Sequence, residues 1–211
     1  MFSTILFDID GTIIDTESVI VSSLQEALSQ TTGREYSHDE LRFILGIPSA
    51  EALAKLNLPE DQTAAVKKLW PEILATRQKQ VTVFATMRRT LAHLQHRGVQ
   101  LGIITSKNNR ELENEFTWFG LNDYFDVIVT ADAHLAPKPA PDPIKFALAE
   151  LGADPEDTMY LGDSIYDMQS AKAAGVSFAV ATWGAFDLSR FEDADYMLTR
   201  PEGLLDLAVI R

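Results

Sequence analysis

Five short, continuous runs of apolar residues constrain the fold of this 211-residue chain more than any other feature. Runs that are apolar throughout, rather than at alternate positions, are typical of strands buried on both faces in a parallel sheet. From residue 101 onward these runs alternate with helical patterns, which predicts a doubly wound α/β fold. The five runs are Ile5–Asp8, Leu101–Thr105, Phe125–Thr130, Met159–Asp163 and Phe178–Thr182.

The helical patterns between the later runs have recognisable ends. A glycine directly after the last turn can adopt the left-handed conformation that ends a helix, and proline suits the first turn. Three patterns carry such a glycine: Met87–Arg97 ends at Gly98, the pattern that opens at Pro143 ends at Gly152, and Asp167–Ala174 ends at Gly175.

The segment after the first run breaks the alternation, because it contains helical patterns and no convincing strand. Ser37-His38-Asp39-Glu40 has the form of a capping box, and Glu60–Gln80 indicates one or two helices around Pro71. We interpret residues 16–80 as an inserted helical domain with hinges at its two ends. Residues 1–15 and 81–211 then form the α/β domain.

Composition narrows the classes of partner. The chain has 31 acidic and 18 basic residues, a formal net charge of −13, and no cysteine. This excess of negative charge repels a nucleic-acid backbone, so we expect no nucleic acid as partner. Because it repels small anions as well, any phosphate site needs local positive charge, and a divalent cation is the simplest supply. The absence of cysteine excludes disulfides and thiolate chemistry.

The beginning of the chain favours a cytoplasmic protein. Met1-Phe2-Ser3-Thr4 carries no basic flank and leads directly into the first apolar run, unlike a signal peptide. No stretch approaches the roughly 20 apolar residues of a membrane-spanning helix. We therefore expect no membrane association, a cytoplasmic location and, by default, a monomer.

Four of the five runs end in a polar residue that could act on a ligand: Asp8, Thr105, Thr130 and Asp163. In open parallel sheets the ligand crevice lies beyond the carboxyl ends of the strands. We therefore expect these side chains to converge on one site.

The sequence Asp8-Ile9-Asp10-Gly11-Thr12 is the strongest local signal. Side chains two residues apart on an extended chain point the same way, about 6.6 Å apart. Carboxylates this close repel each other unless a cation or a shared proton intervenes. Gly11 permits a tight turn that brings backbone N–H groups towards a phosphate.

A second acidic cluster, Gly162–Asp167, lies at a strand-to-helix turn. Asp163 together with Asp8 and Asp10 would form an oxygen-rich site suited to Mg²⁺. Such an ion would neutralise part of the cluster and hold a substrate oxygen in place.

A lysine and two hydroxyls complete the candidate site. Lys138 is flanked by prolines that restrict its backbone, and its ammonium can bind a phosphoryl oxygen. Thr105 and Ser106 can hydrogen-bond a transferring group. Each signal alone has a simpler explanation, namely a solvated turn, a helix cap or a surface lysine. Their order at the ends of successive strands favours a common site.

These residues resemble the motifs of the haloacid dehalogenase superfamily, specifically its phosphoglycolate phosphatase-like branch, over essentially the whole chain. Asp8–Thr12 is similar to the first motif, Ile103-Ile104-Thr105 to the second, Lys138-Pro139 to the third, and Gly162–Asp167 to the fourth. The resemblance implies a Rossmann-like doubly wound parallel sheet with residues 16–80 as an inserted α-helical cap domain.

The resemblance also implies a role for each matching position. Asp8 would be the nucleophile, and Asp10 the general acid and then the base that activates water. Thr105 would orient the phosphoryl group and Lys138 would stabilise its charge. The remaining implied roles are substrate binding by Gly11, Thr12 and Ser106, Mg²⁺ binding by Asp8, Asp163 and the Asp10 carbonyl, and support of Lys138 or metal-bound water by Asp167.

The expected activity is Mg²⁺-dependent hydrolysis of a small phosphorylated metabolite, a phosphoglycolate-like phosphomonoester, through an aspartyl-phosphate. Inorganic pyrophosphatase activity is the close alternative, because relatives share the cap type and a Trp-Gly such as Trp183-Gly184. A β-phosphoglucomutase-like mutase ranks lower, because Thr16–Leu24 lacks the histidine that such a cap supplies. A phosphate-binding protein without turnover is the remote option. Candidates for substrate contact in the cap are Gly46-Ile47-Pro48, Arg34, Arg42 and Lys55.

Overall fold

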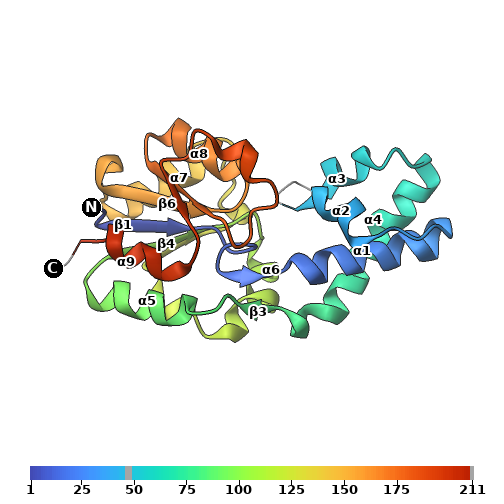
Figure 1. Cartoon of the computed structure of the whole chain (residues 1–211), viewed down its shortest axis with the longest axis horizontal. Coiled ribbons are helices and arrows are strands. Elements are labelled where there is room, and N and C mark those ends of the chain that lie inside the picture. Colours follow the sequence, from blue (N-terminus) through green and yellow to red (C-terminus); the bar gives the residue numbers. More distant parts are fainter. Residues whose placement is uncertain (46–48, 210–211) are drawn as a thin grey trace. The chain divides into compact units, whose positions relative to one another are not determined.

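The structure is a computed structural model that describes residues 1–45 and 49–209, and the chain forms two compact units (Figure 1). Met1–Ile14 and Val83–Arg211 make up the first, called here the core unit. Asp15–Thr82 make up the second, called here the helical unit.

A six-stranded parallel sheet forms the centre of the core unit. Its strands lie in the order β5-β4-β1-β6-β7-β8. The chain first builds outward from β1 to β4 and β5, then returns to the other side of β1. The order therefore reverses at β1, which makes its carboxyl end the point where a doubly wound sheet opens a ligand crevice. The strands are β1 (Thr4–Phe7), β4 (Gln100–Ile104), β5 (Val127–Val129), β6 (Thr158–Gly162), β7 (Ser177–Ala181) and β8 (Tyr196–Leu198).

Helices cover both faces of this sheet. In Figure 1, α7 and α8 lie on one face, and α5 and α9 lie on the other. Continuous apolar strands suit this position, because both faces are buried: all four residues of β1 and all five of β6 are inaccessible or nearly so. The helices are α5 (Met87–His96), α6 (Asn109–Glu115), α7 (Asp142–Leu151), α8 (Ile165–Ala174) and α9 (Leu204–Leu207).

The helical unit packs its helices around a separate apolar cluster. The longest two, α1 and α4, contact each other extensively, and Leu24, Leu28 and Trp70 are among the buried residues. Pro71 lies inside α4, which continues as one helix although proline offers no N–H for the turn before it. The helices are α1 (Glu17–Thr32), α2 (His38–Leu41), α3 (Ser49–Lys55) and α4 (Glu60–Arg77).

The predicted fold class is confirmed: the core is a doubly wound parallel sheet, and the glycines predicted to end helices at 98, 152 and 175 have positive φ. The Ser37 capping box is present. Three strands were not predicted, namely β8 and the two-residue strands β2 (Ile14–Asp15) and β3 (Thr82–Val83), which pair with each other. Among the described residues, no helix has both the length and the apolar character needed to cross a membrane.

Candidate active site

Three carboxylates and one ammonium gather beyond the carboxyl ends of β1 and β6. Asp8 follows β1 directly, Asp163 follows β6 directly, and Asp167 lies in the first turn of α8. One oxygen from each of these acids lies within 4.8 Å of one oxygen from each of the others. Two of the four polar strand ends, Asp8 and Asp163, therefore meet where the topology of the sheet places its crevice.

Lys138 bridges two of these acids. Its Nζ lies 3.0 Å from Asp8 Oδ1 and 2.7 Å from Asp167 Oδ1, and it donates to the Tyr160 hydroxyl at 3.2 Å. Its side chain is only 8% exposed, so both ion pairs are largely shielded from water. A cis peptide bond joins it to Pro139. Lys138 is thus a buried structural partner of the cluster rather than a solvated surface lysine.

Asp167 has both carboxylate oxygens occupied by protein donors. Oδ1 accepts from Lys138 and from the Tyr160 hydroxyl at 2.9 Å, and Oδ2 accepts from the backbone N–H and the hydroxyl of Ser164. The Ser164 contacts form the capping box of α8. Asp167 therefore caps the helix and orients Lys138 at the same time.

Asp163 is packed against the turn that follows β1. Its Oδ1 accepts from Thr12 Oγ1 at 3.0 Å, and Thr12 is buried. Gly11 has φ +75°, and a Cβ there would lie 2.3 Å from Asp163 Oδ2. Only glycine satisfies both the left-handed backbone and this close approach.

The loop after β7 packs against the same turn from another direction. Trp183 Nε1 donates to the Thr12 carbonyl at 3.0 Å, and the Trp183 ring packs edge-on against Phe84. A Cβ on Gly184 would lie 1.8 Å from the carbonyl oxygen of Gly11. The Trp-Gly pair thus fixes the backbone that carries Gly11 and Thr12.

Gly184→Ala is expected to destabilise the protein by about 1–3 kcal/mol or more, because the methyl group meets backbone that cannot rotate away. The matched control is Gly203→Ala, whose Cβ would approach only the flexible end of Leu198, at 3.1 Å. Urea denaturation of both variants measures the difference. Equal denaturation midpoints for the two variants would contradict the close packing of Gly184 on Gly11.

Asp10 pairs with Lys107, which was not among the predicted site residues. Its Oδ2 lies 3.0 Å from Lys107 Nζ, which also lies 2.5 Å from Glu115 Oε2. Burial alone lowers the pKa of Lys107, but the two carboxylates outweigh burial and hold this pKa above its ordinary value. Asp10 Oδ1 is buried and has no hydrogen-bond partner in the described part of the chain.

Thr105 and Ser106 differ in exposure. Thr105 is buried at the end of β4, and its Oγ1 accepts from the backbone N–H of Lys107 at 3.1 Å. Ser106 is exposed. Neither caps α6, because Asn108 forms the capping box of that helix with Glu111. Thr130, the fourth polar strand end, pairs with Asn109 through its hydroxyl.

The buried acids are electrostatically unbalanced without a cation. Burial raises the pKa of Asp8 to about 7 from its ordinary 3.8, and the carboxylates of Asp167 and Asp10 add to the rise, while Lys138 opposes it. Burial, followed by Asp8 and Asp167, likewise raises the pKa of Asp163. One ammonium does not neutralise three carboxylates. The oxygen donors and the excess negative charge fit a hard divalent cation such as Mg²⁺.

Asp163→Asn is expected to stabilise the metal-free protein by about 1–2 kcal/mol, a rise in Tm of about 2–8 °C, because it removes a buried like charge. The folded state binds the Asp163 proton more tightly than the unfolded chain, so this acid's contribution to stability is lost as the pH rises through its raised pKa. The gain from asparagine therefore grows with pH. Thermal melts in chelator at pH 5 and pH 8 measure it. A lower Tm for the variant at pH 8 would contradict the charge imbalance.

The basic residues proposed to contact substrate from the helical unit each lie near an acid of that unit. Arg34 lies 3.6 Å from Glu40, Arg42 lies 2.8 Å from Glu17, and Lys55 lies 2.9 Å from Glu51. The loop Gly46-Ile47-Pro48 lies outside the described residues.

Three residues near the site were absent from the predicted set. Tyr160 lies inside the apolar run Met159–Asp163, and its hydroxyl was the one feature of the residue that could have indicated a role in the site. Lys107 follows the Thr105-Ser106 pair directly, so its proximity to a predicted strand end was the signal. Trp183 had been noted as part of a Trp-Gly pair that relatives share, and not as a site residue.

Known proteins resemble this chain in sequence and in fold. Residues 5–181 match the family described as haloacid dehalogenase-like hydrolase. Pyrophosphatase PpaX from Bacillus velezensis is 32% identical, over 99% of this chain and 97% of the relative. The crystal structure of a candidate phosphoglycolate phosphatase from Lactobacillus plantarum has a TM-score of 0.87 and 24% identity, and covers 98% of this chain and 99% of its own.

A candidate haloacid dehalogenase-like hydrolase from Bacteroides fragilis has a TM-score of 0.85 and 26% identity, and covers 97% of this chain and all of its own, 100%. The family match spans β1 through β7 and so includes every strand end at the site. The motif resemblance seen in the sequence is confirmed, and the chain belongs to the haloacid dehalogenase-like hydrolase family.

Proposed function

We propose that this hydrolase is a Mg²⁺-dependent phosphatase that acts on a small phosphorylated substrate through a phosphoryl group carried by Asp8. The observation that supports this most strongly is the buried cluster in which Lys138 joins Asp8 to Asp167 beside Asp163. A nucleophilic carboxylate, a fixed ammonium and a pair of further acids are the groups that phosphoryl transfer to and from an aspartate requires.

The first step transfers the phosphoryl group to the enzyme. An oxygen of Asp8 attacks phosphorus, the bond from phosphorus to the leaving oxygen breaks, and protonated Asp10 gives its proton to that oxygen. Lys138 and Thr105 stabilise the charge on the transferring group, and the Ser106 hydroxyl binds its oxygens. The backbone N–H groups of Gly11 and Thr12, expected from the sequence to bind substrate, instead donate to the carbonyls of Ile14 and Ile9.

The second step returns the phosphoryl group to water. Asp10, now a carboxylate, takes a proton from water as the water oxygen attacks phosphorus. The bond from phosphorus to Asp8 breaks, and inorganic phosphate leaves. Asp10 is then protonated again and Asp8 is ionised, so the cycle balances.

Asp8, Asp163 and the backbone carbonyl of Asp10 are the groups we propose to hold Mg²⁺. The Asp10 carboxylate is engaged by Lys107, which leaves its carbonyl for this role. Asp167 has both oxygens occupied by protein donors and so acts from outside the coordination sphere. When bound, the ion would supply positive charge for the phosphoryl oxygens and offset the repulsion among the acids.

Inorganic pyrophosphate is the second candidate substrate. The curated relatives named pyrophosphatase PpaX reach 32% identity over nearly the whole chain, and Trp183-Gly184 fixes the Gly11–Thr12 turn. A phosphomonoester remains the first candidate by the motif resemblance. A phosphomutase ranks below both, because Thr16–Leu24 contains no histidine.

We also propose that residues 16–80 are the cap domain of this hydrolase and that residues 1–15 and 81–211 are its core domain. The two compact units support this division. A cap would exclude bulk water during the two transfers and select the substrate.

The test is phosphate release from p-nitrophenyl phosphate, from a panel of small phosphomonoesters and from pyrophosphate, each with Mg²⁺ and with chelator. We expect release in Mg²⁺ alone. A kcat/KM for pyrophosphate above that of every ester would establish the second candidate. No release from any of these compounds in Mg²⁺ would leave the phosphate-binding protein without turnover as the function.

A further inference from the structure

Lys107 forms the centre of a second ion-pair network, distinct from the one around Lys138. Its Nζ lies between two carboxylates, 3.0 Å from Asp10 Oδ2 and 2.5 Å from Glu115 Oε2. The Lys107 side chain is 13% exposed, the Glu115 side chain 21% and the Asp10 side chain 30%, so the network is mostly shielded from water. Shielded ion pairs hold a geometry more strictly than solvated ones.

Lys107 is held at both its backbone and its ammonium. Its N–H donates to Thr105 Oγ1 at 3.1 Å, which ties the residue to the end of β4. Glu115 is the last residue of α6, and the first turn of that helix is fixed by the Asn108 capping box. A lysine restrained in this way has few rotamers available, so its ammonium stays in one position beside Asp10.

The two oxygens of Asp10 are not equivalent. Oδ2 faces Lys107, whereas Oδ1 is buried without a hydrogen-bond partner in the residues the structure describes. A buried carboxylate oxygen left unpaired is costly unless a ligand or solvent group meets it during function. Because Oδ1 is enclosed and Oδ2 is held by Lys107, the ion pair fixes the orientation of the Asp10 carboxylate.

We propose that Lys107, itself held by Glu115, is a positioning residue that holds the Asp10 carboxylate in the orientation in which it exchanges a proton with the leaving group and with water. This inference rests on the proposed role of Asp10 as general acid and base. In this role Lys107 contacts neither the phosphorus nor the leaving oxygen. The proton moves between the Asp10 carboxylate and the leaving oxygen, and the lysine keeps its own proton throughout.

A positioning role has a consequence that general destabilisation does not. Proton donation matters most when the leaving group is a poor one, because a good leaving group departs as an anion with little help. Misplacing Asp10 should therefore slow a substrate with a basic leaving group more than one with an acidic leaving group. The first irreversible step is included in kcat/KM, so this parameter reports the effect.

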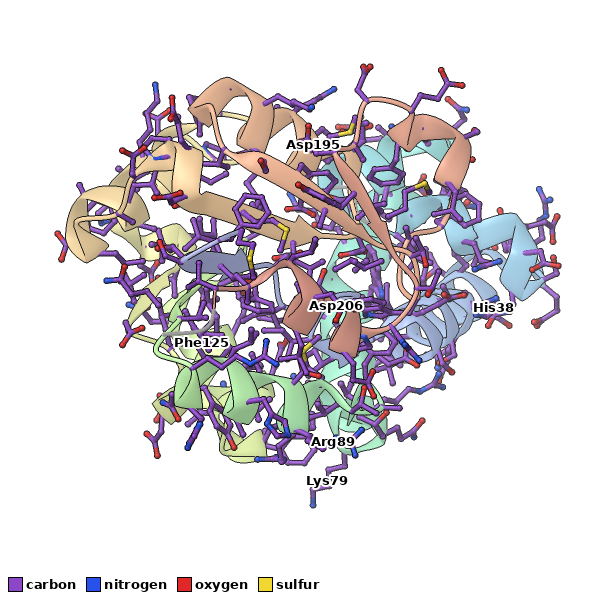
Figure 2. All side chains as sticks on the ribbon, turned by 60° about the vertical axis from the view of Figure 1, so that its left-hand side comes forward. His38, Lys79, Arg89, Phe125, Asp195 and Asp206 are labelled. Carbon is purple, nitrogen blue, oxygen red and sulfur yellow. The ribbon has the colours of Figure 1, made fainter. Side chains whose placement is uncertain are left out.

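The experiment compares phenyl phosphate with p-nitrophenyl phosphate, two aryl esters of nearly the same shape whose leaving groups differ in basicity. Lys107→Met and Glu115→Gln are the test variants, and Lys107→Arg is the conservative one. Lys172→Met is the matched control. Lys172 lies 3.2 Å from Asp195, and its side chain is 43% exposed. Asp195 lies on the loop before β8 and is labelled in Figure 2.

For Lys107→Met we expect kcat/KM to fall about tenfold or more on phenyl phosphate and markedly less on p-nitrophenyl phosphate. Glu115→Gln should show the same pattern more weakly, Lys107→Arg should restore the parent ratio between the substrates, and Lys172→Met should not change it. The ratio is taken within one preparation, so a partly unfolded variant does not distort it.

The Asp10→Asn background separates this inference from the proposed function. Adding Lys107→Met to Asp10→Asn should cause no further loss, because the lysine acts only through Asp10. Equal losses on both substrates for Lys107→Met, or a further loss in the double variant, would overturn the positioning role. If Asp10→Asn itself left the ratio between the substrates unchanged, the role of Asp10 as general acid would be refuted instead.

Discussion

Replacement of Asp8 by asparagine is expected to lower kcat by about 10⁴-fold or more, the largest effect of any single change in the site. The amide is a poor nucleophile and cannot carry the phosphoryl group. It also removes a negative charge from the cluster around Lys138, so the folded protein should remain at least as stable as the parent. Loss of activity would then accompany normal folding.

The measurement is Mg²⁺-dependent phosphate release, together with mass spectrometry of rapidly quenched enzyme to detect the phosphoryl group on the peptide that contains residue 8. Asp206→Asn is the matched control, because Asp206 is an exposed acid on α9, labelled in Figure 2. Phosphate release by Asp8→Asn at the parent rate would refute the nucleophile assignment. A phosphorylated peptide from another part of the chain would do the same.

The fold was predictable because its signals are local. Continuous apolar runs identify strands buried on both faces, and the glycines after α5, α7 and α8 stop helices by a backbone preference that needs no tertiary contact. The strand β8 has only three residues, and Met197 within it is 52% exposed, so it lacks the apolar run that identified the others. The two-residue strands β2 and β3 are shorter than any periodicity can reveal.

The candidate site was predictable where it depends on the topology of the sheet and not where it depends on side-chain pairing. The meeting of Asp8 and Asp163 follows from the rule that strand ends of a parallel sheet converge. The Asp10–Lys107 ion pair joins the turn after β1 to the loop after β4. No local sequence pattern predicts that Lys107 points towards Asp10. Tyr160 was not predicted for a different reason: its ring belongs to the apolar strand, and the hydroxyl that accepts from Lys138 leaves no mark on the apolar pattern.

Lys138→Met is expected to lower the free energy of unfolding by about 3–5 kcal/mol in chelator, because removal of one partner leaves buried carboxylates unpaired. The ammonium makes ion pairs with Asp8 and Asp167 and donates to Tyr160, and its side chain is 8% exposed, so water does not replace these contacts. The neighbouring carboxylates raise the pKa of Lys138 above its ordinary value against the effect of burial, so the ammonium is present at any pH at which the enzyme is assayed.

A double variant separates lost charge pairing from lost packing. If unpaired charge causes the destabilisation, Lys138→Met combined with Asp167→Asn should recover a large part of the lost stability, because the asparagine carries no charge. If the loss came from packing alone, the second change would only add to it, since Asp167 also caps α8 through Ser164. Urea denaturation of the single and double variants in chelator decides between these causes. A double variant less stable than Lys138→Met would show that the buried cluster is held together by shape more than by charge.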